Sequence, residues 1–216
     1  MPELKDAREH MVEAQIARRG IRAESVLSAM REVPREEFVA LGMEEFAYED
    51  GPLPIGEGQT ISQPYIVALM VEAAQIMPAD RVLEVGTGSG YQTALLAELA
   101  ASVISIERHA ALAHDAKQAL TRLGYRNVVL LLGDGSQGVP AYAPYDDIVV
   151  AAAAPEIPPA LFDQLQEGGR MVVPIGPRGE QKLELVEKHS GSPAISTVVG
   201  CRFVPLIGVQ GYSPED

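Results

Sequence analysis

The second part of the chain alternates between β-branched runs and helical runs, and this alternation limits the folds that are open to it. The β-branched runs are RVLEVG (81–86), SVISIE (102–107), NVVLLLGD (127–134), DDIVVAAAA (146–154) and GGRMVVPIG (168–176). The first three are separated by stretches of helical periodicity at 91–99 and 110–123. Strands that alternate with helices form a parallel sheet whose two faces are covered by the helices. We therefore expect a doubly wound α/β fold.

Helical and irregular segments precede this sheet. Apolar residues recur every three or four positions over 6–17 and 23–30, which predicts two short helices, and a third helix is expected from about Arg35. The segment YEDGPLPIGEGQTISQ (48–63) is rich in glycine and proline and lacks periodicity, so we expect an irregular loop. A loop of this length in a compact domain usually has a function. The apolar run after Pro64 predicts a buried helix that begins at that proline.

The C-terminal part carries alternating patterns that predict antiparallel strands at the edge of the sheet. These patterns are KLELVEK (182–188) and STVVGCRFVPLIG (196–208), joined by a loop with Gly191 and Pro193. We divide the chain into residues 1–63, with the N-terminal helices and the long loop, and residues 64–216, with the core and the C-terminal strands. At 216 residues the two parts are expected to form one compact domain.

Charge and cysteine content exclude several classes of function. Thirty acidic residues against seventeen basic residues give a net charge of −13, which would repel a nucleic-acid backbone, so we expect no nucleic-acid partner. The cluster of Arg18, Arg19 and Arg22 lies among acidic and polar positions and is interpreted as a solvated helix face. Cys201 is the only cysteine, so an internal disulfide and a multi-cysteine metal site are excluded, and we expect no metal. Because we find neither a signal peptide nor an apolar stretch of about 20 residues, we expect a cytoplasmic protein with no membrane partner.

The segment VLEVGTGSGYQTALLAEL (82–99) combines a buried strand, three glycines and an amphipathic helix. Glycines at such a junction permit a tight turn and a close approach of ligand to backbone, and the start of the helix offers unpaired N–H groups. A dinucleotide fingerprint requires glycine or alanine where this chain has Tyr91, so NAD binding is disfavoured. Taken alone, the three glycines could also be nothing more than a tight strand-to-helix turn.

Carboxylates in register with the glycines favour a cofactor site over the plain turn. Glu84 precedes them in the spacing acidic-x-Gly-x-Gly-x-Gly, which resembles the first motif of class I S-adenosylmethionine-dependent methyltransferases, a Rossmann-like fold. Glu107 ends the next strand, where a carboxylate can accept both ribose hydroxyls, although alone it could be a helix cap at the surface. Asp134 ends the third strand and could accept from the adenine amino group, while Gly135 would let the loop lie flat against the base. The predicted cofactor-binding residues are Glu84, Gly86, Thr87, Gly88, Ser89, Gly90, Glu107, Arg108, Asp134 and Gly135.

Side chains that could activate a nucleophile are scarce. The histidines at 10, 109, 114 and 189 share no motif, and we expect them to be solvated. Cys201, between hydrophobic residues of a predicted strand, is expected in the core. A carboxylate is already ionised at pH 7 and needs no general base, so this scarcity favours a carboxylate as methyl acceptor. Such an enzyme mainly orients and desolvates its substrates.

Six segments occur here in an order and spacing that characterise one enzyme family. They are VPREEFV (33–39), YEDGPLPIGEGQTISQPYIVALM (48–70), VLEVGTGSGYQTALLA (82–97), YDDIVVAAAAPEIPPALFDQL (145–165), GGRMVVPIG (168–176) and RFVPL (202–206). On these segments the chain resembles the protein-L-isoaspartate (D-aspartate) O-methyltransferase family from about residue 11 to residue 206. The GQTISQP sequence is specific to that family, whereas the glycine motif alone is not.

The resemblance implies a reaction and its partners. A methyl group would pass from S-adenosylmethionine to the α-carboxylate of L-isoaspartyl residues, with D-aspartyl residues as a further acceptor, leaving S-adenosylhomocysteine. The partners would be damaged proteins and peptides, and we expect the enzyme to be a monomer with an N-terminal helical extension on the class I methyltransferase fold. The loop at 48–63 would then be the substrate and active-site loop.

The resemblance also implies which residues contact the substrate. Ser62 of the TISQP segment would be the catalytic residue, because its hydroxyl could donate to the substrate carboxylate and aim it at the methyl carbon. Thr60, Ile61 and Gln63 would line the same wall. Ser62 could instead N-cap the helix that follows.

The RFVPL segment resembles the peptide-binding edge of the family. Backbone groups of Val204, Pro205 and Leu206 would hydrogen-bond an extended substrate, and core packing is the alternative. Two departures from the family pattern are an alanine in AAAAPE (151–156) where other members often have threonine, and a short polar tail, GVQGYSPED (208–216).

Overall fold

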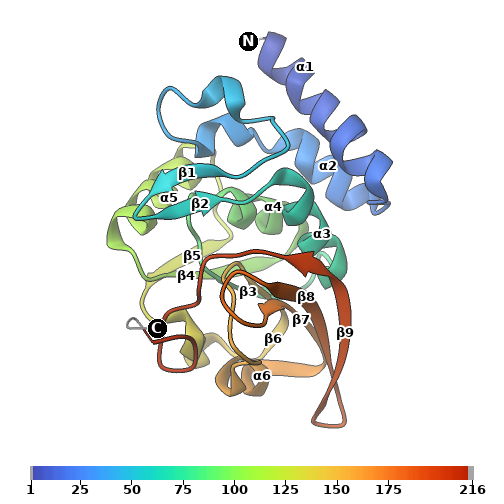
Figure 1. Cartoon of the computed structure of the whole chain (residues 1–216), viewed down its shortest axis with the longest axis vertical. Coiled ribbons are helices and arrows are strands. Elements are labelled where there is room, and N and C mark those ends of the chain that lie inside the picture. The colour runs from blue at the N-terminus through green and yellow to red at the C-terminus, as the bar shows by residue number, and fades with distance from the viewer. Residues whose placement is uncertain (1, 214–216) are drawn as a thin grey trace.

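A seven-stranded sheet is the centre of the computed structural model, which describes residues 2–213 and their side chains from Leu4 onward (Figure 1). The strands are β3 (Arg81–Val85), β4 (Ser102–Glu107), β5 (Val128–Leu132), β6 (Tyr145–Val150), β7 (Leu165–Ile175), β8 (Gln181–His189) and β9 (Ser192–Cys201). Their order in the sheet is β5-β4-β3-β6-β7-β8-β9. The first five are parallel, and β8 and β9 are antiparallel additions at one edge. The predicted doubly wound α/β fold with C-terminal antiparallel strands is confirmed.

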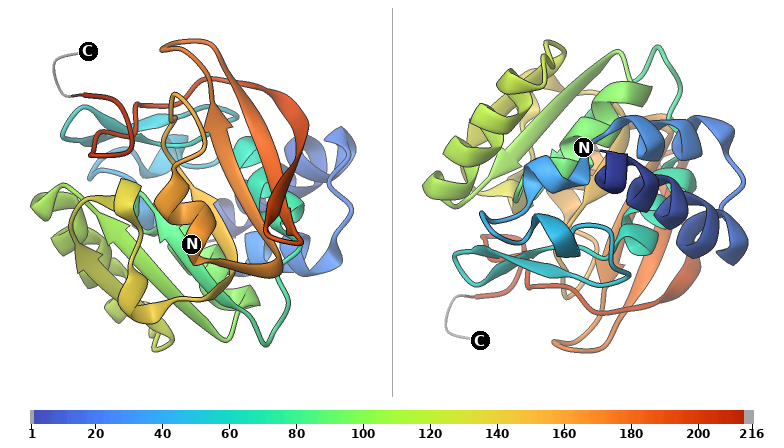
Figure 2. Two further views of the ribbon diagram at one scale, coloured as in Figure 1. Left: turned by 90° about the horizontal axis from the view of Figure 1, so that it is seen from below. Right: turned by 90° about the horizontal axis from the view of Figure 1, so that it is seen from above.

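Helices cover both faces of this sheet. Successive side chains of a strand point to opposite faces, so Val82 and Val149 join one hydrophobic cluster, while Leu83 and Ile148 join the other. The first cluster is covered by α3 (Pro64–Ala74), α4 (Tyr91–Leu99) and α5 (Ala110–Arg122), and the second by α6 (Pro159–Gln164). The two end-on views in Figure 2 show these helices on either side of the strands. The predicted helices at 91–99 and 110–123, and the predicted start at Pro64, agree with these bounds.

The N-terminal segment adds further helices on the side of α3 and α4. Helix α1 (Pro2–His10) continues into a π-helical stretch (Met11–Ile16) and a 3-10 turn (Ala17–Arg19), and α2 (Glu24–Glu32) follows. Gly20, with a φ of +110°, ends the first helical run. None of the helices in residues 2–213 is long and apolar enough to cross a bilayer.

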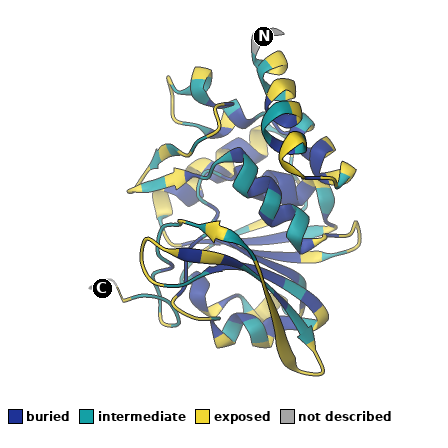
Figure 3. Ribbon diagram, turned by 45° about the vertical axis from the view of Figure 1, so that its right-hand side comes forward, coloured by how far each residue is buried: buried dark blue, intermediate teal, exposed yellow. Residues whose placement is uncertain are grey.

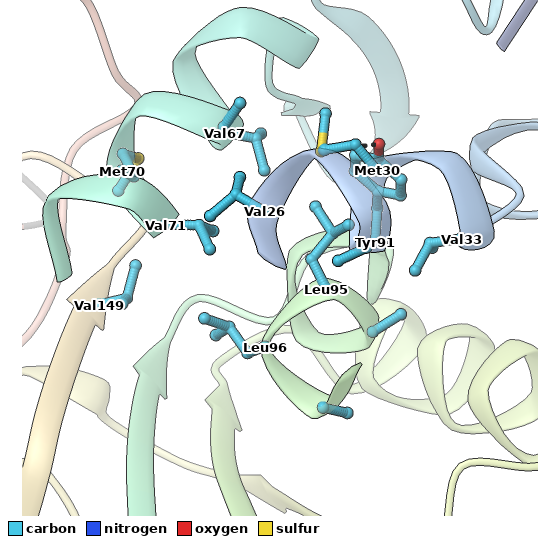
Figure 4. Packing of buried hydrophobic residues seen from close by; sticks show 14 of the residues in the cluster. Val26, Met30, Val33, Val67, Met70, Val71, Tyr91, Leu95, Leu96 and Val149 are labelled. Atoms are coloured by element: carbon cyan, nitrogen blue, oxygen red, sulfur yellow. Dashed lines mark hydrogen bonds between the residues drawn. The ribbon is translucent and has the colours of Figure 1, made fainter. Parts of the chain in front are cut away.

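Helix α2 shares its core with the sheet. Val26 and Met30 lie among side chains of α3 and α4, close to Val71 and Leu95 (Figure 4). The hydroxyl of Tyr91 donates to the sulfur of Met30 at 3.6 Å. Figure 3 shows the centre of the sheet fully buried, whereas the outer side of α1 and much of β9 are exposed. The N-terminal helices are therefore packed onto the α/β core as an extension.

The segment expected to be an irregular loop contains a β-hairpin. Strands β1 (Leu53–Gly56) and β2 (Gln59–Ile61) pair antiparallel through a tight turn. Glu57 and Gly58 form this turn with φ values of 52° and 69°, the left-handed conformation that two-residue hairpin turns require. The prediction of an irregular loop was wrong over this stretch, because an alternating pattern of only four and three residues is too short to stand out among glycines and prolines.

Two further expectations need correction. The third helix near Arg35 is only a 3-10 turn (Arg35–Phe38), in which Arg35 and Phe38, three residues apart, both turn inward. The last predicted strand, 196–208, ends at Cys201, and the chain then crosses the carboxyl end of β6, where Pro205 bridges Ala153. Residues 214–216 of the polar tail lie outside the described residues.

Candidate functional site

The order of the strands reverses between β3 and β6, which is the place where open α/β sheets bind ligands. Gly86 follows β3 and Ala151 follows β6, and the N–H of Ala151 donates to Val85 O at 2.8 Å. A Cβ at Gly86 would lie 3.5 Å from the Ala151 side chain, so the two strand ends are in contact. The small side chain of Ala151 keeps this crevice open.

The loop between β3 and α4, residues 86–90, is called the glycine loop, and other elements pack closely against it on both sides. Gly88 has a φ of +55°, and a Cβ there would lie 3.3 Å from the Ile55 side chain of the β1–β2 hairpin. Gly90 has a φ of +90°, and a Cβ there would lie 3.2 Å from that of Ala116 on α5. Helix α4 begins directly after Gly90, which provides no side-chain cap. The N–H of Tyr91 donates to Ser89 Oγ at 3.4 Å, and the N–H groups of Gln92 and Thr93 remain available to a ligand.

Glu84 lies beneath this loop and is completely buried. Its carboxylate accepts hydrogen bonds from Thr93, Gln92 and Ser105, with 2.6 Å between Ser105 Oγ and Oε2. The Ser105 hydroxyl also bonds that of Thr87 in the glycine loop. Burial raises the pKa of Glu84 to about 7, and the hydrogen bonds offset this only in part. Glu84 thus supports the loop and the start of α4 from below.

Glu107 joins the end of β4 to the glycine loop. Its Oε2 accepts from Gly88 N at 2.9 Å, and its Oε1 accepts from the N–H groups of Arg108 and His109 at 2.8 and 2.9 Å. The side chain is almost fully buried and lines two small cavities, of about 90 and 60 Å³, on either side of it. Arg108 is exposed and lines the first of these.

Asp134 follows β5, and its two oxygens are fully engaged. Oδ1 accepts from the N–H and hydroxyl of Ser136, while Oδ2 accepts from the side chain of Gln137 and from Val209 N. Burial opposes ionisation, but the hydrogen bonds from Val209, Ser136 and Gln137 together hold the pKa of Asp134 below its ordinary value. Gly135 packs so closely that a Cβ would lie 2.6 Å from the Val85 side chain.

Ser62 lies between the end of β2 and the first turn of α3. The N-cap of α3 is Gln63, without a side-chain hydrogen bond, so the alternative in which Ser62 caps this helix is wrong. The carbonyl of Ser62 accepts from Nη2 of Arg35 at 2.9 Å, while Nε of Arg35 donates to Ala47 O at 2.7 Å. Arg35 is completely buried and stacks over the Tyr91 ring at 4.9 Å, and its Nη1 has no partner among residues 2–213. Burial lowers the pKa of Arg35 to about 10.

The TISQP segment and the glycine loop meet in one cavity. The cavity of about 60 Å³ is lined by Thr60, Ile61, Ser62, Gly86, Thr87, Gly88, Ser89, Glu107 and Val204. Ser62, Thr60 and Gln63 also line a neighbouring cavity of about 630 Å³, whose far wall includes Val204 and Pro205. Glu84, Gly90, Asp134 and Gly135 are not among the described residues that line these cavities.

The RFVPL segment (202–206) both packs against the core and lines the larger cavity. Val204 O accepts from Ala153 N at 2.8 Å, and Leu206 N donates to Ala153 O at 2.7 Å. The Leu206 side chain is buried in the second hydrophobic cluster. Among residues 2–213, the Val204 N–H and the Pro205 carbonyl have no backbone partner.

Several contributors were missed or misjudged from sequence. His109 is half-buried instead of fully solvated: it lines the cavity beside Glu107 and lies 3.5 Å from a carboxylate oxygen of Glu57. Cys201 is half-buried and lines the larger cavity, and burial together with Glu184 raises the pKa of its thiol to about 11. Arg35 was visible only as part of VPREEFV, and nothing in that pattern indicates that its guanidinium reaches Ser62.

Comparison with known proteins gives a consistent result. A family model described as protein-L-isoaspartate(D-aspartate) O-methyltransferase matches residues 6–211. A protein-L-isoaspartate O-methyltransferase from Koribacter versatilis is 59% identical over 207 residues, which are 96% of this chain and 93% of that protein. A solved structure of a protein-L-isoaspartate O-methyltransferase superposes with a TM-score of 0.85 at 33% identity, covering 94% of this chain and 67% of the other. Another, a Plasmodium falciparum protein of the same enzyme name in complex with S-adenosyl-L-homocysteine, gives 0.81 at 28% identity and covers 93% and 98%.

Proposed function

The chain belongs to the protein-L-isoaspartate(D-aspartate) O-methyltransferase family, and from this premise we propose which residues carry out the reaction. It is a repair enzyme that transfers a methyl group from S-adenosylmethionine to L-isoaspartyl residues of damaged proteins. When bound, S-adenosylmethionine supplies an electrophilic methyl group on a positively charged sulfur. D-Aspartyl residues are a second acceptor that we propose from the family name.

The glycine loop and Glu107 form the proposed cofactor-binding region. The loop offers backbone N–H groups at the start of α4, and its positive φ values at Gly86, Gly88 and Gly90 let a ligand approach without a Cβ in the way. Glu107 presents a nearly buried carboxylate at the neighbouring strand end, which suits the hydroxyls of a ribose. The donor set therefore fits an adenosyl group. Glu84 acts through the loop, because its own carboxylate is enclosed by Thr93, Ser105 and Gln92.

Ser62 is the proposed catalytic residue. Ser62 lines both the cavity shared with the glycine loop and the larger cavity of about 630 Å³. A hydroxyl there can donate to one oxygen of the substrate carboxylate and leave the other free to attack. No general base is needed for an ionised carboxylate, and the high pKa of the Cys201 thiol argues against a thiolate nucleophile.

One observation carries this assignment. Ser62, Gly88 and Glu107 come from three separated parts of the sequence and line the same small cavity. A transferred methyl group must lie between a cofactor and an acceptor at contact distance, and this arrangement brings the walls of both sites together.

Two further proposals accompany the assignment of the active site. Residues 1–63 and 64–216 act as one domain, because α2 packs on α3 and α4. The enzyme is a monomer of the cytoplasm, where its single cysteine stays reduced.

The decisive experiment compares an isoaspartyl peptide with its normal aspartyl twin. We expect radioactive methyl transfer from S-adenosylmethionine to the first and none to the second. If neither peptide is methylated, a small-molecule methyltransferase is favoured. If calorimetry then still detects binding of S-adenosylmethionine, a cofactor-binding protein without turnover is the other alternative.

Variants separate the two proposed roles. Ser62→Ala removes a hydrogen bond to a charged group, so turnover should fall by about 10- to 100-fold while cofactor affinity changes little. Glu107→Ala should chiefly raise the cofactor dissociation constant. Ser28→Ala, an exposed serine on α2, is the matched control. If Ser62→Ala is as active as this control, the assignment of Ser62 is wrong.

A further inference from the structure

The larger cavity is basic although the chain as a whole is strongly acidic. The net charge is −13, yet Arg178 and Arg202 line the cavity of about 630 Å³ beside Ser62. Among the described residues that line it, none is aspartate or glutamate. A cleft lined by one sign of charge focuses the potential at its mouth, so this cavity attracts carboxylates that the rest of the surface repels.

Arg178 is held at the mouth of the cavity by the C-terminal segment. It lies between β7 and β8, with its guanidinium 5.1 Å from the ring centre of Tyr212. Nη2 donates to the carbonyl of Ser213 at 3.4 Å. Tyr212 is itself fixed, because its hydroxyl donates to Gly176 O. Within residues 2–213, Arg178 therefore makes contacts that orient it, and none of them is with a carboxylate.

Arg202 is the second cation of this wall. It follows β9 directly, is exposed, and has no hydrogen-bond or ion-pair partner among residues 2–213. Four other arginines have carboxylate partners, namely Arg19, Arg31, Arg122 and Arg170. Arg178 and Arg202 line the cavity, and neither forms an ion pair with a carboxylate of residues 2–213.

We propose that Arg178 and Arg202 determine specificity, by favouring isoaspartyl segments that carry a second acidic side chain near the damaged residue. The proposal rests on the proposed function, since it takes the cavity beside Ser62 as the peptide site. A volume of about 630 Å³ exceeds what one carboxylate needs, so neighbouring side chains of a peptide fit as well. The two cations then pair with flanking carboxylates, while Ser62 receives the one that is methylated.

The expected effect is modest, because both arginines are exposed to solvent. Exposed ion pairs contribute about 0.2–1 kcal/mol, so each arginine should favour an acidic over a neutral flank by about 1.4- to fivefold in kcat/KM. The preference should appear mainly in KM and should weaken as salt rises.

The test uses two isoaspartyl peptides of equal length, one with glutamate and one with glutamine beside the isoaspartate. The ratio of their kcat/KM values is measured for the parent enzyme, for Arg178→Gln, for Arg202→Gln and for the double variant. Arg126→Gln is the control, because Arg126 is exposed in the loop before β5, at the end of the strands opposite to the site. For all five proteins, the ratio of the two kcat/KM values is measured at low and at high salt.

We expect the parent and the control to prefer the glutamate peptide, and each cavity variant to lose part of this preference. An unchanged ratio in the double variant would overturn the proposal, and so would an equal loss in the control. If both peptides are methylated at equal rates by the parent, the arginines attract only the reacting carboxylate and the proposal fails while the proposed function stands. If neither peptide is methylated, the proposed function itself fails.

Discussion

Replacing Glu84 by glutamine should change how the stability of the protein depends on pH. The carboxyl group is completely buried beneath the glycine loop, and burial raises its pKa from 4.5 to about 7 despite three hydrogen bonds. A carboxyl group with a raised pKa holds its proton more tightly in the folded than in the unfolded chain. It has no effect on stability at low pH, where both states are protonated, and it becomes destabilising as the pH rises from 4.5 to 7.

The size of this effect follows from the two pKa values. Each tenfold change in proton affinity corresponds to about 1.4 kcal/mol, so the full penalty above pH 7 is about 3 kcal/mol. It amounts to about 1 kcal/mol at pH 5 and about 3 kcal/mol at pH 8. Glu84→Gln cannot ionise, so its unfolding free energy relative to the parent should rise by about 2 kcal/mol between these pH values. Any constant cost of altered hydrogen bonds is present at both pH values and cancels.

Urea unfolding of parent and variant between pH 5 and pH 8 measures this difference directly. Glu156→Gln, at an exposed position, is the control and should follow the parent at every pH. If the curves of parent and Glu84→Gln run parallel, the Glu84 carboxyl does not titrate with a raised pKa and the reasoning is refuted. Cofactor affinity of the same variant tests the view that Glu84 acts through the loop: a large loss would indicate direct contact instead.

Three further changes test other parts of the structure. Burial and Asp80 raise the pKa of Asp147 to about 8, so Asp147→Asn should raise the unfolding free energy by at least about 2 kcal/mol at pH 8 and by little at pH 4. An equal effect at both pH values would contradict the raised pKa. Arg35→Met removes two hydrogen bonds from a charged donor, which contribute about 3–6 kcal/mol, and it also removes a desolvation cost of about 3 kcal/mol. We therefore expect the unfolding free energy measured in urea to fall by about 2 kcal/mol, and turnover to become slower. A variant as stable as the parent would show that these bonds contribute nothing. Gly208→Ala would place a Cβ 2.0 Å from Asp134 Oδ1, so the C-terminal segment should detach and be cut faster by proteases, whereas cleavage at the parental rate would speak against this docking.

The sheet could be predicted because its signals are local. The central strands are buried on both faces and therefore read as continuous β-branched runs, and the helices between them have complete periodic patterns. The β1–β2 hairpin could not be predicted, since its two short strands are stabilised by contacts with residues far away in sequence, such as that of Ile55 with the glycine loop. Strand β9 was extended too far for the same reason: residues after Cys201 keep an alternating pattern but pair with Ala153 instead of β8.

The strand ends and loops on which the candidate residues lie could be predicted from the sequence, but the connections between their side chains could not. The spacing of Glu84 before the glycines identifies the motif, yet it does not say on which side of the loop the carboxylate lies. Here the side chain meets Thr93 and Ser105, which come from α4 and β4. Arg35 shows the same limit, because a charged residue is expected at the surface. Its burial depends on carbonyls 12 and 27 residues away, a partnership that no local pattern reveals.

The carboxylates at the two strand ends differ in how much they can still bind, and this difference bears on cofactor recognition. A carboxylate accepts about four hydrogen bonds. Glu107 accepts three from backbone N–H groups, so one position on Oε2 remains for a ribose hydroxyl, and a second becomes available if Gly88 N turns to the ligand. We propose that Asp134 binds the adenine amino group. Since Asp134 already accepts four hydrogen bonds, that amino group has to displace one donor, most easily the exposed side chain of Gln137 at 3.2 Å. The exchange at Asp134 replaces one bond by another, and we therefore expect Glu107 to contribute the larger share of cofactor affinity.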